Sequence, residues 1–167
     1  MTHEATLSAA PFDPTEALRQ FSAAAEGAGA VVSFTGLARG TTRDGRPVAV
    51  LVLEGHRSLT LRSMDDIAAA ARARFAITAS RVIHREGRIL PGEPIVFVAA
   101  AAPHRRAAFE AADYMMDRLK SEAVFWKREE GPDGARWIEP TTEDAADLAR
   151  WQDADGADAS RTDYARN

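Results

Sequence analysis

The chain has 167 residues, of which 46% are hydrophobic and 28% are charged, a composition typical of a globular protein with one core. Its net charge of -4 argues against a protein that binds nucleic acid or an anionic membrane through bulk charge. The chain contains no cysteine, which excludes disulfides, thiolate metal sites and a cysteine nucleophile.

The N-terminal residues 1–11 are expected to be flexible. They contain Glu4 and lack both a basic start and an apolar core, so they do not form a signal peptide. No apolar run in the chain approaches the roughly 20 residues that a membrane span requires. We therefore expect a cytoplasmic protein that does not associate with membranes.

The first half of the chain predicts one helix and two strands. The stretch DPTE at residues 13–16 predicts a helix start, because Asp13 can cap the helix and Glu16 can reach back to the cap. Residues 30–36 are β-branched and aromatic, which predicts a strand. Residues 48–54 are apolar at nearly every position, which predicts a strand that is buried on both faces.

The middle of the chain predicts a helix followed by a hairpin. Apolar residues recur at spacings of three and four over residues 61–75, as expected for a helix. Residues 79–89 and 94–102 both have strand composition. They flank the sequence LPGE at residues 90–93, whose Pro-Gly pair is typical of a type II turn, so we expect the two strands to pair.

The last third predicts a helix, a second hairpin and a polar tail. The helix opens at Pro103 and His104 and ends near Ser121. Two strand-like segments flank the turn sequence GPDG at residues 131–134. Residues 152–167 are polar and are expected to be disordered. Strand pairs and helices without strict alternation indicate an α+β fold, with a mainly antiparallel sheet and packed helices.

The sequence HR at His104 and Arg105 lies where a strand gives way to a helix. Free N–H groups at a helix N-terminus bind anions readily, so these two side chains can belong to an anion site. An equally good interpretation is that both point into solvent and Arg105 pairs with a carboxylate. The remaining histidines, His3, His56 and His84, show no metal-binding spacing, so no metal site is expected.

Two lysines, Lys120 and Lys127, flank an apolar patch. Lys120 falls roughly 20° beyond the apolar arc of its helix, where a lone lysine usually extends its amine into solvent. A lysine between apolar surface and other cations can instead have a lowered pKa, which suits it to base or nucleophilic chemistry. Strand alternation places Lys127 on one face with Phe125 and Glu129, and an edge strand guarded by a lysine is the simplest interpretation of that segment alone.

Taken together, several cationic side chains are placed where a ligand could meet them in a chain that is net acidic. An anionic and phosphorylated ligand is the simplest common explanation for them. These cations are Arg39, His104, Arg105, Lys120, Lys127 and Arg128.

Three stretches resemble the catalytic (large) subunit of molybdopterin synthase. They are GAVVSFTGLAR, VIHREGRILPGEPIVFVAAAAPHRRAAFEAADYMMDRLKSEAVFWKRE and GARWIE. The resemblance covers residues 12–151 as one domain, with the motifs in the same order. The chain departs from the commoner family pattern in LARG after Gly36 and in LEGHRSLT, which affects local loop contacts.

The resemblance implies an α/β-hammerhead fold and a sulfur-transfer reaction. The family converts cyclic pyranopterin monophosphate to molybdopterin by adding two sulfurs as a dithiolene. Sulfur arrives as a thiocarboxylate on the C-terminal Gly-Gly of a small ubiquitin-like (β-grasp) partner subunit. The large subunits form a central homodimer with one small subunit at each end, and both large subunits contribute to each active site. No cofactor is implied.

By the same resemblance, Lys120 and Lys127 are the catalytic residues. Lys120 would lie nearest the incoming tail and act as the base or as a transient covalent partner, while Lys127 would stabilise charge or carry a proton. The other site residues are implied to bind the phosphate and pterin or to line the site: Arg39, His104, Arg105, Arg128 and Glu129.

Two other functions are compatible with parts of the sequence. A catalytically inert protein could bind a ubiquitin-like tail in an aromatic-lined groove, with the lysines only attracting an acidic tail. Nucleic-acid binding through the basic residues is opposed by the negative net charge.

Overall fold

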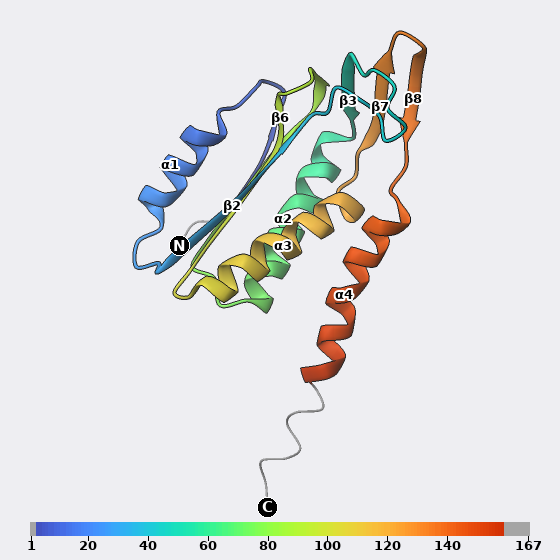
Figure 1. The fold of residues 1–167 in the computed structure, drawn as a ribbon. Coiled ribbons are helices and arrows are strands. Elements are labelled where there is room, and N and C mark those ends of the chain that lie inside the picture. Colours follow the sequence, from blue (N-terminus) through green and yellow to red (C-terminus); the bar gives the residue numbers. More distant parts are fainter. Residues whose placement is uncertain (1–2, 159–167) are drawn as a thin grey trace, which may run out of the picture.

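The computed structural model describes the backbone of residues 3–158, and the positions of side chains within residues 4–152 (Figure 1). Helices and strands alternate irregularly along the chain. They are β1 His3–Ser8, α1 Pro14–Ala24, β2 Ala30–Leu37, β3 Val50–Glu54, α2 Arg57–Arg74, β4 Ala79–Arg85, β5 Gly87–Ile89, β6 Pro94–Ala102, α3 Arg105–Glu122, β7 Trp126–Gly131, β8 Gly134–Ile138 and α4 Thr142–Asp158.

The strands form two four-stranded sheets. The first has the order β1-β4-β6-β2 and the second the order β5-β3-β7-β8. All pairings are antiparallel except that of β1 with β4. Helix α1 covers one face of the first sheet, and α2 and α3 cover the other (Figure 1). The predicted α+β class with mainly antiparallel sheets is therefore confirmed.

Strand β6 is the centre of the core because helices cover both of its faces. Phe97, Ala99 and Ala101 pack toward α1, while the alternate residues Val98 and Ala100 pack toward α2 and α3. Each buried phenylalanine or valine side chain contributes about 1.5–3 kcal/mol to folding. The alanines leave room for the helices to approach the sheet closely.

The segment predicted as one strand over residues 79–89 is two strands. Glycine at position 87 has a φ of 85° and turns the chain from the first sheet into the second, so β4 pairs with β6 whereas β5 pairs with β3. The predicted hairpin between β4 and β6 is confirmed. So is its turn, in which Glu93 N donates to Leu90 O at 3.1 Å and Gly92 has a φ of 86°.

The expectation that residues 1–11 are flexible is wrong for His3–Ser8. These residues form β1, which pairs with β4 in parallel over six positions, and Leu7 is buried in the core. The segment is short and its partner lies more than 70 residues away in sequence, so its local pattern gave no strand signal. At the next element the prediction holds, because Asp13 caps α1 by accepting from Thr15 N at 2.8 Å.

Helix α4 was not predicted, and the expected disordered tail from residue 152 is wrong up to Asp158, where α4 ends. Thr141 and Asp144 begin this helix with reciprocal hydrogen bonds: Thr141 N donates to Asp144 Oδ2 at 2.9 Å, and Asp144 N donates to Thr141 Oγ1 at 3.2 Å. This capping box was readable in the sequence. The rest of the predicted tail, residues 159–167, lies outside the described residues. Within the described range, no helix has the length and apolar character needed to cross a membrane.

Candidate functional site

Two adjoining pockets lie near the C-terminal end of α3, between β2 and β7. The larger has a volume of about 490 Å³ and is lined by Arg39, Lys120 and Lys127 together with apolar side chains of β2 and α3. The smaller has a volume of about 280 Å³ and extends along the inner face of β3 and β7 to Glu129. Five residues line both pockets: Leu37, Arg39, His84, Ile95 and Lys127.

Lys120 and Lys127 are the only lysines among the 167 residues, and both reach the larger pocket. Lys120 projects from the last turn of α3, where the helix dipole favours a cation. Its side chain is 53% exposed, and its Nζ lies 3.3 Å from Asp144 Oδ1 on α4. Lys120 is therefore an ion-paired residue at the mouth of the pocket, in agreement with its predicted rim position.

Lys127 lies deeper in the pocket than Lys120. In the sheet its cross-strand neighbours are Leu53 of β3 and Ile138 of β8, both apolar. Burial lowers the pKa of Lys127; the Asp144 carboxylate opposes this shift and the Lys120 ammonium adds to it. Lys127 is thus an amine that gives up its proton more readily than an exposed lysine does.

His84 is a pocket residue that the sequence analysis did not select. It is 6% exposed and stacks on Phe125, with ring centroids 4.3 Å apart. Its Nδ1 lies 2.8 Å from the carbonyl oxygen of Arg85. Because a carbonyl oxygen only accepts, Nδ1 carries the hydrogen and Nε2 is left as an acceptor. The available signal was strand alternation, which places His84 on the same inward face as Val82.

His84 is neutral at physiological pH. Burial lowers its pKa to about 4; the hydrogen bond to Arg85 opposes the shift and the charge of Lys127 adds to it. No described residue occupies Nε2. The pocket therefore combines two amines with a neutral acceptor.

Arg39 lies two residues after the end of β2 and lines both pockets. Among the described residues, no carboxylate forms an ion pair with it. Its guanidinium is free to bind an anion at the pocket, in keeping with the anion-binding role expected from the sequence.

His104 and Arg105 lie at the opposite end of α3 from the lysines. Arg105 precedes Lys120 by fifteen residues, which is about 22 Å along the helix axis. The pair lines a separate hollow of about 680 Å³ with Arg106 and Phe109. A single chain therefore does not bring His104 and Arg105 to the lysine pocket.

Glu129 and Arg128 project from opposite faces of β7. Glu129 lines the smaller pocket and pairs with Arg136 of β8 at 3.1 Å. Arg128 points to the other face, where it pairs with Glu130 at 2.9 Å and lies 5.3 Å from the centre of the Trp137 ring. Of these two predicted residues, only Glu129 contributes to the pocket wall.

The model of a known family, the MoaE protein, matches residues 7–122 of the chain. The chain belongs to this family. Among the family's curated members, the molybdopterin synthase catalytic subunit of Caulobacter vibrioides is 50% identical over 146 residues, covering 87% of this chain and 95% of that protein. The resemblance read from the sequence motifs is therefore confirmed.

Solved structures of the family share the fold. The molybdopterin cofactor biosynthesis protein E of Burkholderia multivorans is 33% identical, with a TM-score of 0.75 over 91% of this chain and 98% of that one. A complex of subunits 1 and 2 of the molybdopterin-converting factor from Helicobacter pylori contains a chain that is 18% identical, with a TM-score of 0.67, covering 81% of this chain and 90% of that one. The family fold thus includes both sheets that form the pocket.

Proposed function

We propose that this protein transfers sulfur from the thiocarboxylated tail of a small partner subunit to cyclic pyranopterin monophosphate, and so forms the dithiolene of molybdopterin. One observation carries the proposal: the only two lysines of the chain meet in one pocket, beside an arginine that no described carboxylate neutralises. The name of the similar protein from Caulobacter vibrioides, a molybdopterin synthase catalytic subunit, supports it. A cytoplasmic location is part of the proposal.

Each transfer exchanges the thiocarboxylate sulfur for an oxygen. The acyl–sulfur bond of the tail breaks and an acyl–oxygen bond forms in its place, so the tail is left as a carboxylate. A bond forms from the sulfur to a substrate carbon, and a carbon–oxygen bond at that carbon breaks. No oxidant or reductant is consumed, and two tails supply the two sulfurs. The exchange requires a proton acceptor and a cation that stabilises negative charge on the oxygen or sulfur that departs.

The two lysines suit these two roles differently. Burial lowers the pKa of Lys127, so Lys127 is the better proton acceptor. Lys120 is half exposed at the mouth of the pocket, so it is the amine that an incoming tail would meet first. This division gives the base role to Lys127, whereas the family resemblance alone gave that role to Lys120.

Substrate binding would combine Arg39 with the His104–Arg105 pair of a second copy. A hollow of about 530 Å³ runs along α3 and β2 from Arg106 to Lys120, and exposed Phe34 and Phe109 line it. Strand β2 is also the last strand of its sheet among the described residues, and an edge strand can pair with a second chain. An antiparallel second copy on this surface would bring its cationic end of α3 toward the lysine pocket, which is why we include a homodimer in the proposal.

The partner in the proposal is a β-grasp protein that ends in Gly-Gly. The Helicobacter pylori complex of two subunits supports a two-subunit enzyme. The tail would enter at Lys120, which is the exposed member of the lysine pair.

The test is a reconstituted reaction with the thiocarboxylated partner and the pterin substrate, followed by measurement of the dithiolene product. We expect Lys127→Ala to lower the rate at least about 100-fold, because it removes the proton acceptor. Binding of the partner subunit by the same variant should be retained, which separates chemistry from assembly. Tail binding by the wild-type protein without any product would instead identify a non-catalytic binding module.

A further inference from the structure

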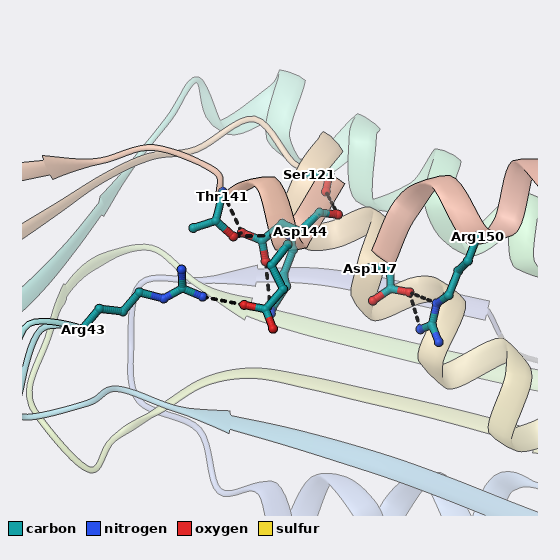
Figure 2. A network of polar contacts seen from close by, with 8 residues as sticks. Arg43, Asp117, Ser121, Thr141, Asp144 and Arg150 are labelled. Atoms are coloured by element: carbon teal, nitrogen blue, oxygen red, sulfur yellow. Dashed lines mark hydrogen bonds and ion pairs between the residues drawn. The ribbon is translucent and has the colours of Figure 1, made fainter. Parts of the chain in front are cut away.

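Helix α4 brings a carboxylate to the lysine pair. Asp144 lies in its first turn with a side chain that is 18% exposed, and its Oδ1 lies 3.3 Å from Lys120 Nζ. The other oxygen, Oδ2, accepts from Thr141 N at 2.9 Å and from the Thr141 hydroxyl at 2.7 Å. Figure 2 shows the contact between Thr141 and Asp144. Because Thr141 holds one oxygen, the other oxygen is the one that lies beside Lys120.

The position of α4 is fixed at two further points along α3. Close to the lysine pocket, the Ser121 hydroxyl donates to the Asp144 carbonyl at 3.4 Å. Two turns further along α4, Asp117 accepts from Arg150 at 2.5 Å and from Trp151 Nε1 at 2.7 Å. Figure 2 shows both attachments on the same side of α3. The carboxylate therefore lies on a helix that is attached to α3 at two points.

We propose that Asp144 is a positioning residue for the sulfur transfer: its carboxylate holds the Lys120 ammonium at the mouth of the pocket and fixes the place of Lys120 relative to Lys127. This inference rests on the proposed function. Two neighbouring amines repel each other when both are protonated, and a fixed carboxylate beside one of them offsets that repulsion. The model of the family ends at residue 122, before α4 begins.

Lys127 shares its pockets and its surroundings with titratable groups from several elements. These groups are Lys120 on α3, Asp144 on α4, His84 on β4, Arg39 after β2 and Glu129 on β7. Besides burial, the Asp144 carboxylate raises the pKa of Lys127 and the Lys120 ammonium lowers it. Removal of the Asp144 charge should therefore lower the pKa of Lys127.

The test uses Asp144→Asn, which removes the charge but keeps an oxygen that can accept from Thr141. Glu143→Gln is the matched control, because Glu143 is the neighbouring carboxylate on α4 and pairs with Arg43 instead of a lysine. The first readout is the ¹³Cε chemical shift of ¹³C-lysine in the full chain, followed by NMR against pH. With only two lysines in the chain, both titrations are resolved.

We expect Asp144→Asn to move the Lys127 titration to lower pH by about 0.5–1 unit, as expected for the loss of one nearby charge. Glu143→Gln should leave the titration in place. In the reconstituted two-subunit enzyme, the acid limb of the kcat profile should move in the same direction, and the plateau should fall about tenfold because Lys120 loses its fixed position.

Thr141→Ala separates charge from helix capping. It removes the capping hydroxyl and leaves Asp144 charged, so it should lower the melting temperature while moving the lysine titration less than Asp144→Asn does. An unchanged titration in Asp144→Asn, or equal shifts in Asp144→Asn and either of the other two variants, would overturn the inference. Because the titration needs no turnover, it decides the role of Asp144 even if no dithiolene product forms and the proposed function fails.

Discussion

At the scale of single residues, the pocket is built from groups whose charge is set by burial. His84 is buried and Lys127 is partly buried beside apolar side chains, and this burial lowers the pKa of each. Both groups are therefore driven toward the neutral form, in which an amine or imidazole can accept a proton or a hydrogen bond. The burial that makes these groups able to accept a proton or a hydrogen bond also lowers the stability of the fold.

The substitution Lys127→Met should show how much stability this lysine removes from the fold. The pKa of Lys127 is lower in the folded chain than in the unfolded chain, so the unfolded chain binds the proton more tightly. The protein therefore loses stability as the pH falls below the unfolded pKa, and at neutral pH Lys127 destabilises the fold. We expect the substitution to raise the free energy of unfolding by about 1 kcal/mol and to abolish sulfur transfer. Thermal melting and product formation measure the two effects.

Lys120→Met is the control for that experiment. Lys120 is half exposed and ion-paired, so its removal should not stabilise the protein. An equal stabilisation by both substitutions would contradict the account of Lys127.

His84 predicts how stability depends on pH. Its pKa is lowered from 6.5 to about 4, so the unfolded chain binds a proton between these values and the folded chain does not. The stability that neutral His84 contributes is present above about pH 6.5 and lost as the pH falls toward 4, by about 2–3 kcal/mol.

We expect His84→Phe to remove this loss while keeping the stacking contact with Phe125. Thermal melts of wild type and variant between pH 4 and 7 measure the difference. His56→Phe, a change at an exposed position before α2, should leave the pH dependence intact. Parallel curves for wild type and His84→Phe would contradict the burial of a neutral imidazole.

At the scale of elements, α4 is attached to α3 mainly through polar groups. Asp117 is 7% exposed and accepts hydrogen bonds from Arg150 and Trp151, while the Trp151 ring contacts the edges of Phe75 and Tyr114. Because these contacts are mainly polar, the α4 sequence shows little of the apolar periodicity that predicts a packed helix.

Asp117→Ala should detach α4. It leaves the Trp151 Nε1–H and the Arg150 guanidinium without their acceptor, at a cost of about 2–4 kcal/mol. We expect faster amide hydrogen exchange over residues 142–152. Asp113→Ala, which removes the more exposed partner of Arg150, should have a smaller effect. Unchanged exchange in Asp117→Ala would show that other contacts hold the helix.

The elements that could be predicted from the sequence are those with local signals. The Pro91-Gly92 turn requires a positive φ at one residue, and the position of Lys120 beside the apolar arc follows from helical periodicity. Strand β1 and helix α4 carry few apolar residues, and their stability comes from partners far away in sequence. The inward direction of His84 was signalled by alternation, but its neutral state depends on Phe125 and on the depth of the pocket, which only the fold provides.

At the scale of the whole molecule, the predicted site is divided between two places in one chain. Arg39 and the lysines share a pocket, whereas His104 and Arg105 lie at the far end of α3. The sequence placed these residues on the correct elements, and it could not assign them to the same or to different copies of the chain. Only a second copy of the chain could bring a His104–Arg105 pair next to the lysine pocket.

Subunit complementation tests that assembly. Lys127→Ala and Arg105→Ala should each be inactive alone, because each leaves every site of its homodimer defective. Mixed and reassembled, they should recover about a quarter of wild-type activity, since half of the dimers are mixed and one of the two sites in each is intact. Product formation after mixing is the measurement.

A substitution on the apolar surface provides the control. Phe109→Asp should prevent both assembly and complementation, while Leu59→Asp, at an exposed apolar residue on α2, should affect neither. Sedimentation reports the assembly state. Failure of the mixed chains to recover any activity would mean that one chain supplies the whole site.

The turn at Gly87 has a mechanical consequence for the pocket. His84 on one side and the second sheet on the other belong to a single uninterrupted run of chain, and that run changes sheets at one residue with a φ of 85°. Nothing lies within 4 Å of a Cβ placed there, so it is the positive φ, and not a lack of space, that favours glycine at this position. A residue with a side chain at position 87 would be strained by this φ, and the strain would fall where the chain passes from one wall of the pocket to the other.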